Sequence, residues 1–305
     1  CRSQVEGVDA PDRNDEYLFY QALVGSWPAG LAEPVAPPEL VPRLKDYMAK
    51  ATREAKVHTS WITANEGYDQ AVARFVEEAL TGPRAREFLT RFVPFQRRVA
   101  HAGMINSLAQ LVLKVASPGV PDFYQGTELW DLSLVDPDNR RPVDYGHRAA
   151  ALAELEPWLD DRAPKPPAEQ AAAVADWLAN WPDGRIKLFV TACGLRLRRS
   201  APDLFLSGAY VPLAVEGERA DHAVAFARRL GDEWVVAVVP RLVAPLSASK
   251  SALPVGVAVW GDTVVRLPGE CTASAFRNAF TREPVPATPG AEGSAVRLAD
   301  ALGVC

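Results

Sequence analysis

The stretch PGVPDFYQGTELWDLSLVDPDNRRP, residues 118–142, decides how this sequence is interpreted. It begins with a short apolar run, Val120–Phe123, which predicts a β-strand, and it then turns polar within a few residues. Packing one strand into a fold does not require so many hydrogen-bonding side chains behind it. The polar residues are therefore candidates for binding a ligand: Tyr124, Gln125, Glu128, Asp131, Asp136, Asp138, Asn139, Arg140 and Arg141.

The composition is that of an ordinary globular protein, with 305 residues of which 48% are hydrophobic and 23% are charged. This length is sufficient for a sizeable core or for two domains. The net charge of -5 and the pI near 5.5 argue against a general nucleic-acid-binding protein. No apolar run approaches the roughly 18 to 20 residues of a membrane span, and no secretory signal is visible. We therefore expect a cytoplasmic protein that contacts no membrane.

The cysteines at positions 1, 193, 271 and 305 form no C-x-x-C pair and have no histidine at ligand spacing. This pattern disfavours a zinc site and a dense disulfide framework, so isolated reduced thiols are expected. The string DPDN at 136–139 has some likeness to a calcium loop, but it lacks the glycine and the glutamate that such a loop needs. We expect neither a metal ion nor a cofactor.

The first 115 residues are predicted to be helical. Asn14 is a candidate N-cap for a helix that Pro28 closes, and Asn65 precedes a segment with apolar residues at helical spacing. A long helix is expected from Glu87 to Val115, bent or split near Pro94. Further helices are predicted at residues 39–56, 148–159, 168–181 and 184–205.

From about Leu206 the sequence changes to short β-rich runs bounded by Gly, Pro and Asp. The run AVAFARRLGDEWVVAVV, residues 223–239, predicts a hairpin with Gly231 and Asp232 in its turn. We therefore expect a mainly helical part with one strong strand, residues 1–203, followed by a smaller all-β domain, residues 204–305.

Several segments resemble a known family. GVPDFYQGTE (119–128) resembles the last barrel strand of the α-amylase superfamily, which has the pattern G-x-P-x-x-Y-x-G-x-E. Three segments narrow the resemblance to the maltooligosyl trehalose synthases, and they occur in the order found in that family. They are KVHTSWITANEGYDQAV (56–72), residues 118–145 with the specific string DPDNRRPVD, and ADHAVAFAR (220–228). The resemblance implies the C-terminal part of a (β/α)8 barrel followed by a small β-sandwich domain.

The resemblance also implies an activity, intramolecular transglucosylation in trehalose biosynthesis. Such an enzyme converts the reducing-end α-1,4 bond of a maltooligosaccharide into an α,α-1,1 bond. The chemistry is that of a retaining glycosidase, with a nucleophilic carboxylate and a carboxylic acid. The displaced glucose is held and used as the acceptor while water is kept out. A maltooligosaccharide or starch-type glucan is then the expected partner.

The catalytic carboxylates of this superfamily follow barrel strands four, five and seven, the last in a T-H-D-x-K-R context that does not occur here. The chain begins with Cys rather than Met, and its first residues are similar to a segment shortly after that third carboxylate. We therefore expect a C-terminal fragment without a complete catalytic set, which works with the N-terminal remainder of the same enzyme. The less favoured alternative is an acid–base pair of Glu128 with Asp131, Asp136 or Asp138.

A loop that follows a barrel strand lies at the active-site face, so the resemblance implies that residues after Phe123 contact substrate. Tyr124 would stack on a glucose ring, while Gln125 and Glu128 would bond its hydroxyl groups. A second candidate contact is formed by His58 and Trp61, although an indole packed in the helical core is an equally good interpretation of Trp61.

The charged string at the end of the stretch allows two interpretations. Arg140 and Arg141 offer planar donor forks to sugar oxygens or to catalytic carboxylates. Alternatively, they pair with Asp136 and Asp138 and only fix the loop, which leaves Asn139 as its neutral member. All five residues are retained as candidate substrate contacts.

Two other functions are kept open. The chain would fit a non-catalytic glucan-binding or regulatory module that retains the sugar-facing loop and the β domain. It would also fit a fragment of an ordinary α-amylase-type hydrolase, which the string DPDNRRPVD disfavours.

Overall fold

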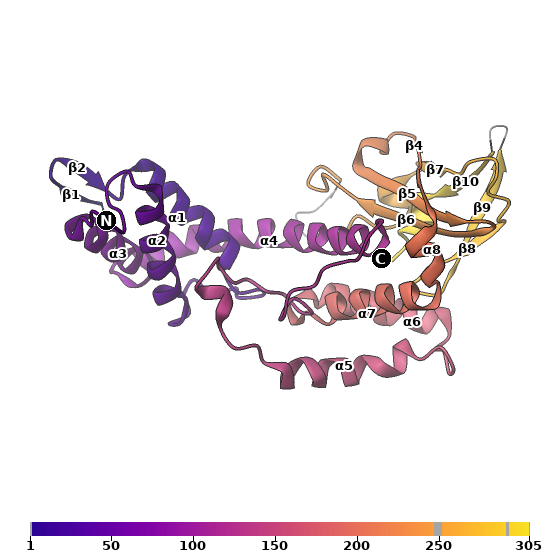
Figure 1. The fold of residues 1–305 in the computed structure, drawn as a ribbon, viewed down its shortest axis with the longest axis horizontal. Coiled ribbons are helices and arrows are strands. Elements are labelled where there is room, and N and C mark those ends of the chain that lie inside the picture. The colour runs from indigo at the N-terminus through magenta and orange to yellow at the C-terminus, as the bar shows by residue number, and fades with distance from the viewer. Residues whose placement is uncertain (1, 247–251, 291–292, 305) are drawn as a thin grey trace. The chain divides into compact units, whose positions relative to one another are not determined.

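The computed structural model describes residues 2–246, 252–290 and 293–304, and Figure 1 shows the order of the elements. The chain divides into two compact units, each of which combines two stretches of sequence. Unit 1 holds residues 1–100 and 131–143, and unit 2 holds residues 101–130 and 144–305. The expected domain boundary after residue 203 lies within unit 2 and stays a prediction. Cys1 and Cys305 lie outside the described residues, and Cys271 is a buried free thiol.

Unit 1 is built mainly from helices around one apolar core. Phe19, Leu44 and Val76 are fully buried in this core, and the ring of Phe19 meets that of Phe75 edge-on at 5.4 Å. The elements are β1 (Ser3–Val5), β2 (Val8–Ala10), α1 (Arg13–Ser26), α2 (Leu40–Ala55), α3 (Glu66–Thr81) and the first half of α4 (Ala85–Ala116).

Side-chain caps determine where two of these helices begin. The helix predicted after Asn65 is α3, and Asn65 caps it: its Oδ1 accepts a hydrogen bond from the backbone N–H of Tyr68 at 3.0 Å. The prediction that Asn14 caps α1 is wrong. Asp12 is the cap, with Oδ1 accepting from the backbone N–H of Asp15 at 2.8 Å, and Asn14 already lies in the first helical turn.

Helix α4 runs for 32 residues with Pro94 inside it, so the helix that was expected to be bent or split near Pro94 is not split. A proline removes one hydrogen bond from the helical ladder, and the turns on either side continue the helix. By length and composition α4 is apolar enough to cross a membrane. This differs from the expectation that no apolar run approaches the length of a membrane span. Core helices have the same composition. Several side chains of α4 are indeed buried, Leu89 and Phe92 in unit 1 and Leu111 and Val115 in unit 2.

The segment after α4 does not form the predicted strand. Val120–Phe123 has no regular secondary structure, and no strand of the described chain pairs with it. A parallel strand takes its hydrogen bonds from its neighbours, so an isolated run of apolar residues cannot form one. Val120 is accordingly 86% exposed.

Unit 2 continues with helices and ends with strands, as predicted. The predicted last helix, 184–205, consists of a long and a short helix that meet at Ala201. The helices are α5 (Tyr145–Leu159), α6 (Pro167–Ala179), α7 (Arg185–Ser200), α8 (Pro202–Ser207), α9 (Val257–Trp260) and α10 (Leu298–Ala301).

The strands form two antiparallel sheets with the orders β3-β5-β6 and β4-β7-β10-β9-β8. The predicted hairpin is confirmed: Leu230 of β5 pairs with Glu233 of β6 across the turn at Gly231. Apolar side chains of both sheets, including Val236 and Val285, share one cluster. The strands are β3 (Ala209–Pro212), β4 (Val215–Glu216), β5 (Ala223–Leu230), β6 (Glu233–Pro240), β7 (Val264–Arg266), β8 (Ala275–Arg277), β9 (Pro284–Gly290) and β10 (Gly293–Arg297).

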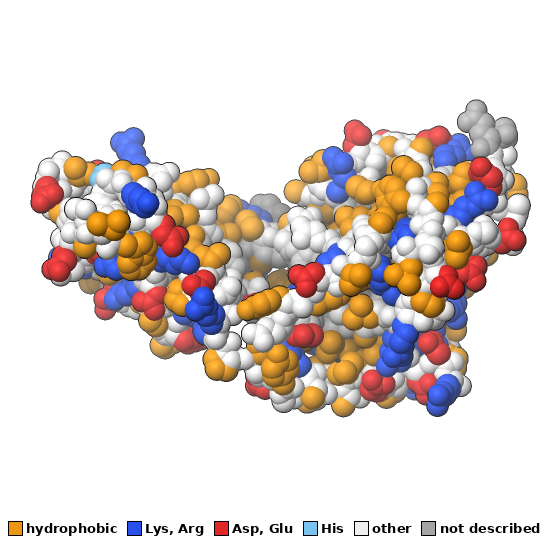
Figure 2. Space-filling view, in the orientation of Figure 1, with side chains coloured by type: hydrophobic (Ala, Val, Ile, Leu, Met, Phe, Trp, Pro, Cys, Tyr) orange, Lys and Arg blue, Asp and Glu red, His pale blue; other side chains and the backbone are white. Residues whose placement is uncertain are grey.

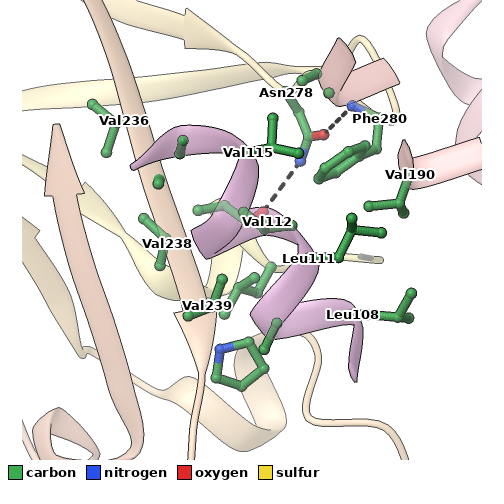
Figure 3. A pocket seen from close by; sticks show the side chains of 18 of the residues that line it. Leu108, Leu111, Val112, Val115, Val190, Val236, Val238, Val239, Asn278 and Phe280 are labelled. Atoms are coloured by element: carbon green, nitrogen blue, oxygen red, sulfur yellow. Dashed lines mark hydrogen bonds between the residues drawn. The ribbon is translucent and has the colours of Figure 1, made fainter. Parts of the chain in front are cut away.

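An apolar cavity of about 430 Å³ lies inside unit 2, lined by side chains of α4, α7 and β6. Figure 3 shows α4 between the valines of β6 on one side and Val190 and Phe280 on the other. The polar residue Asn278 at this cavity is already bonded. It accepts from the backbone N–H of Phe280 at 2.8 Å and donates to the carbonyl of Ala301 at 3.2 Å. Such a lining offers little to a sugar, whose hydroxyl groups need polar partners.

Candidate functional site

The sequence-predicted site residues fall into three groups, and each group is described within its own unit. The first is the polar loop, defined as residues 131–143 of unit 1, which holds Asp136, Asp138, Asn139, Arg140 and Arg141. The second is the connection between α2 and α3 in unit 1, which holds His58 and Trp61. The third is the turn after α4 in unit 2, which holds Tyr124, Gln125 and Glu128.

Asp138 is the centre of the polar loop. It begins a short 3₁₀ turn, and its side chain is only 7% exposed. The guanidinium of Arg43, on α2, binds both carboxylate oxygens: Nε lies 2.8 Å from Oδ1, and Nη2 lies 2.9 Å from Oδ2. The same Nη2 donates to the carbonyl of Leu132 at 2.9 Å, and the backbone N–H of Leu134 donates to Asp138 Oδ2 at 2.7 Å. One planar guanidinium therefore fastens the loop to α2.

The surroundings of Asp138 favour its ionised form. Burial by itself raises the pKa of this carboxyl. The hydrogen bonds from Arg43 and the Leu134 N–H, together with the positive charges of Arg43 and Arg141, outweigh burial and hold the pKa below its usual range. The general acid of a glycosidase needs a pKa above the usual range of a carboxyl group. Asp138 is therefore suited to fixing the loop and unsuited to protonating a leaving group.

The other charged side chains of the polar loop also have protein partners. Arg140 forms an ion pair with Asp136, and Arg141 Nε lies 3.1 Å from Asp138 Oδ1. Lys50 of α2 donates to the carbonyl of Asp136 at 2.7 Å. This is the pairing of the loop-fixing alternative, and sugar contact by these residues stays a prediction. Arg140 is 74% exposed, so its guanidinium is accessible to a ligand.

Asn139 differs from its charged neighbours in the polar loop. Its side-chain Oδ1 is buried, and no hydrogen-bond donor for it is found among the described residues. A buried acceptor without a donor costs about 1–3 kcal/mol. Asn139 therefore keeps a side-chain acceptor for which the described part of the protein supplies no donor.

The turn that holds Tyr124, Gln125 and Glu128 is tied to α5 by Arg148. Glu128 Oε2 accepts from Arg148 Nε at 3.1 Å, and Arg148 Nη2 donates to the carbonyl of Gly126 at 2.6 Å. Gly126 has a φ of +90°, a conformation that glycine adopts without strain. The side chains of Tyr124 and Gln125 are exposed, so both present their polar groups to solvent.

His58 belongs to a network of titratable side chains at the start of α1. Its Nε2 lies 2.8 Å from Asp12 Oδ2, and its ring lies 4.7 Å from that of Tyr68. The Tyr68 hydroxyl accepts from the Asp12 N–H at 3.1 Å and donates to Asp15 Oδ2 at 2.5 Å. Only the other ring nitrogen of His58, Nδ1, is then left for a ligand. Trp61 is exposed, with the Arg53 guanidinium 4.8 Å from its ring centre.

The two carboxyls of this network shift in opposite directions. Burial raises the pKa of Asp15, and the negative charge of Asp12 adds to the increase, despite the hydrogen bond from Tyr68. Burial also raises the pKa of Asp12, but the backbone N–H of Asp15 and the contact with His58 outweigh it, so the net shift is downward. Asp12 is therefore held as the carboxylate that caps α1 and binds His58.

The residues that anchor the site, Arg43, Lys50 and Arg148, were missed by the sequence reasoning. Arg43 and Asp138 are separated by 95 residues in the chain, and Lys50 and Asp136 by 86, so no local pattern connects them. One signal was present. Arg43 and Lys50 lie seven residues apart, which places both on one face of a helix and indicates that an acidic segment packs against this face.

Within each unit these side chains offer an exposed ring, guanidinium donors, carboxylates and an amide, which is the chemistry that binds a polyhydroxylated ligand. Among the residues that the structure describes, no three His, Cys, Asp or Glu side chains lie where they could hold a metal ion. Figure 2 shows acidic and basic side chains mixed over the visible face, and no extended basic surface.

No family model matches this chain. Curated relatives in two strains of Mycobacterium tuberculosis, CDC 1551 / Oshkosh and ATCC 25618 / H37Rv, are each described as a putative maltooligosyl trehalose synthase. Each is 41% identical over 229 residues, which is 75% of this chain and 25% of the relative. The chain therefore spans about a quarter of the length of the curated relatives that it matches.

Solved structures give the same result. The maltooligosyltrehalose synthase of Arthrobacter ramosus is 34% identical with a TM-score of 0.66, over 94% of this chain and 31% of that one. A hypothetical maltooligosyl trehalose synthase of Sulfolobus tokodaii is 29% identical with a TM-score of 0.62, over 95% of this chain and 31% of that one.

Proposed function

Because this chain belongs to the maltooligosyl trehalose synthase family, we propose that it is part of a trehalose-forming enzyme that acts on maltooligosaccharides. The whole enzyme would be a (1→4)-α-D-glucan 1-α-D-glucosylmutase, an isomerase that moves the terminal glucose from an α-1,4 to an α,α-1,1 bond. The observation that carries the proposal is the 41% identity to the mycobacterial relatives over 75% of the chain. A cytoplasmic location belongs to the same proposal.

The fold proposed for the complete enzyme uses this chain as the end of an amylase-type barrel, residues 1–203, followed by a β-sandwich, residues 204–305. The missing barrel strands would give Val120–Phe123 the hydrogen-bonding neighbours that it lacks here. The apolar cluster shared by the two antiparallel sheets supports the sandwich.

The catalytic carboxylates are proposed to come from the N-terminal remainder of the enzyme. Of the acidic site residues, Asp138 has a lowered pKa, which does not suit a general acid. Both of its oxygens are bound by Arg43, which leaves neither free to attack a sugar. Glu128 is similarly occupied by Arg148 at 3.1 Å. The chain would then supply substrate contacts: Tyr124, Gln125, Glu128, Asp136, Asp138, Asn139, Arg140, Arg141, His58 and Trp61.

A comparison of two proteins with maltopentaose tests this proposal. One is the 305-residue chain alone, and the other is the same chain fused behind the N-terminal part that a mycobacterial relative has in addition. We expect the fusion to remove reducing ends without releasing glucose, and the chain alone to remove none. Loss of reducing ends with the chain alone would contradict the proposal that this chain lacks the catalytic carboxylates.

Two further outcomes would replace the proposal by its alternatives. Release of glucose and shorter maltooligosaccharides as the main products of the fusion would identify an α-amylase-type hydrolase. Saturable binding of maltopentaose to the chain, with no turnover by the fusion, would identify a non-catalytic glucan-binding or regulatory module. In the fusion, Arg140→Ala should raise the KM for maltopentaose, whereas Arg199→Ala, an exposed arginine on α7, should leave it unchanged.

A further inference from the structure

A second, polar pocket of about 90 Å³ lies entirely within unit 2, apart from the site residues described above. It is formed where the end of α5, one face of α7 and the loop after β8 meet. Its lining includes Trp158, Asp161, Gln170, Arg196, Arg277 and Arg282. None of them has a role in the proposed binding of glucan.

The charge of this pocket is positive, because three of its side chains are arginines and one is an aspartate. The aspartate is occupied: Asp161 Oδ1 accepts from Arg282 Nη2 at 3.0 Å. Arg196 donates to the carbonyl of Leu159 at 2.6 Å and lies 3.2 Å from Glu156. Arg277 is exposed, and no hydrogen bond or ion pair of its guanidinium is found within the described part of the chain.

The backbone at Arg282 adopts a strained conformation that directs its side chain toward the pocket. Arg282 has a φ of +63°, a left-handed conformation that disfavours a residue with a side chain. Its N–H donates to the carbonyl of Asn278 at 2.9 Å, which closes the loop after β8. The side chain of Arg282 is thereby brought back against α5, where it is mostly buried.

Gln170, on α6, lines the same pocket and holds a buried acceptor, its Oε1. The residue is 1% exposed, and its Nε2 donates to the carbonyl of Phe280 at 2.6 Å. This bond fixes the orientation of the amide, because turning it would place Oε1 against another carbonyl oxygen. Within the described residues no donor reaches Oε1. A ligand that fits here should therefore offer a hydrogen-bond donor as well as negative charge.

We propose that this pocket binds a hydrogen phosphate group, held by the guanidinium of Arg277 with Arg196 and Arg282, with its P–OH directed toward Gln170. Guanidinium groups match tetrahedral oxyanions through paired N–H donors. About 90 Å³ provides room for roughly six water-sized groups, and a phosphate has five heavy atoms. Near neutral pH a phosphate or its monoester still carries a proton in part, whereas sulfate carries none.

This proposal is independent of transglucosylation, because it concerns residues outside the proposed glucan contacts. The same group has two possible sources, inorganic phosphate and the phosphate of a sugar monoester. The indole of Trp158 in the pocket wall would provide a surface for an attached sugar ring. A hexose phosphate that binds more tightly than inorganic phosphate would identify the monoester as the source, and equal affinities would identify the free ion.

The experiment is isothermal titration of the full 305-residue chain at fixed ionic strength and pH 6.5, with inorganic phosphate, a hexose 6-phosphate and sulfate in turn. We expect phosphate to bind with one site per chain, and sulfate at least tenfold more weakly, because an oxyanion without a proton leaves Gln170 Oε1 unpaired. Arg277→Ala should weaken phosphate binding at least tenfold. Arg199→Ala removes the same charge from an exposed position outside the pocket and should weaken it less than twofold.

A second variant tests the role of the acceptor. Gln170→Leu removes Oε1 and should reduce the preference of phosphate over sulfate, whereas Arg277→Ala should weaken both anions alike. Circular dichroism of each variant checks that it is folded, and Arg277→Ala carries the test if Gln170→Leu is not. Equal binding of phosphate and sulfate, equal effects of Arg277→Ala and Arg199→Ala, or no saturable binding of phosphate would each overturn the proposal.

Discussion

Replacing Arg43 by alanine should release the polar loop from α2. The substitution removes three hydrogen bonds, two to the carboxylate of Asp138 and one to the carbonyl of Leu132. A hydrogen bond to a charged group contributes about 1.5–3 kcal/mol, and breaking a buried ion pair costs about 3–5 kcal/mol. Arg141 lies 3.1 Å from Asp138 and would still neutralise part of its charge. We therefore expect a net cost of about 2–3 kcal/mol.

Hydrogen exchange measures this cost locally, at the backbone N–H of Leu134 that donates to Asp138 Oδ2 at 2.7 Å. A loss of about 2–3 kcal/mol corresponds to roughly 30- to 150-fold faster exchange if the loop opens separately from unit 1. Arg43→Lys should recover only part of the protection, because an ammonium group cannot bind two oxygens as a fork. The matched control is Arg140→Ala, since an exposed ion pair contributes at most about 1 kcal/mol.

The same measurement has a pH dependence with a definite sign. Because folding lowers the pKa of Asp138, its contribution to stability is fully present above its unfolded pKa of about 3.9. That contribution is lost as the pH falls through the folded pKa, so the difference between wild type and Arg43→Ala should begin to shrink near the unfolded pKa and disappear below the folded one. Exchange at Leu134 that is unchanged by Arg43→Ala at pH 6, or that Arg140→Ala accelerates equally, would refute Arg43 as the anchor.

Three further predictions concern packing and capping. Gly194→Ala should destabilise unit 2 by about 1–3 kcal/mol in thermal unfolding, because its Cβ would lie 2.9 Å from Val115 Cγ1. The control is Gly103→Ala on α4, whose Cβ meets no atom within 4 Å, so this variant should be neutral or stabilising. Asp12→Ala should lower the stability of unit 1 by about 1–2 kcal/mol, since it removes the cap of α1 and the partner of His58, while Asn14→Ala should change it by less than about 0.5 kcal/mol. Val238→Phe should partly fill the apolar cavity, and titration of an apolar dye should then show weaker binding than to wild type.

Most helices and the β5–β6 hairpin could be predicted because their signals are local. The helix after Asn65 was predicted from its periodic apolar residues, and Gly231 with Asp232 marked a tight turn. Asn14 was mistaken for a cap because Asp12 offers the same chemistry two residues earlier. Only the backbone, which is extended at Asp12, distinguishes the two.

One error and one omission arose from interactions that a local pattern does not contain. Val120–Phe123 has the composition of a strand, but a strand also requires neighbours, and none in the described chain pairs with it. Asp138 was named a candidate sugar contact because of its position in a polar string, and that role stays a prediction. The sequence does not reveal that a guanidinium 95 residues away binds both of its oxygens.

The difference between buried and exposed members of the polar loop leads to a sharper expectation for substrate binding. Asp138 is nearly enclosed, and its oxygens are occupied by Arg43 and Leu134, so its effect on a sugar should be indirect, through the position of the loop. Arg140 is paired only with Asp136 and is mostly exposed. Arg140→Ala should therefore reduce glucan binding without loosening the loop, whereas Arg43→Ala should reduce glucan binding and also loosen the loop. If Arg140→Ala leaves glucan affinity unchanged while Arg43→Ala lowers it, the loop acts through its backbone and Asn139, and its arginines serve only to hold its shape.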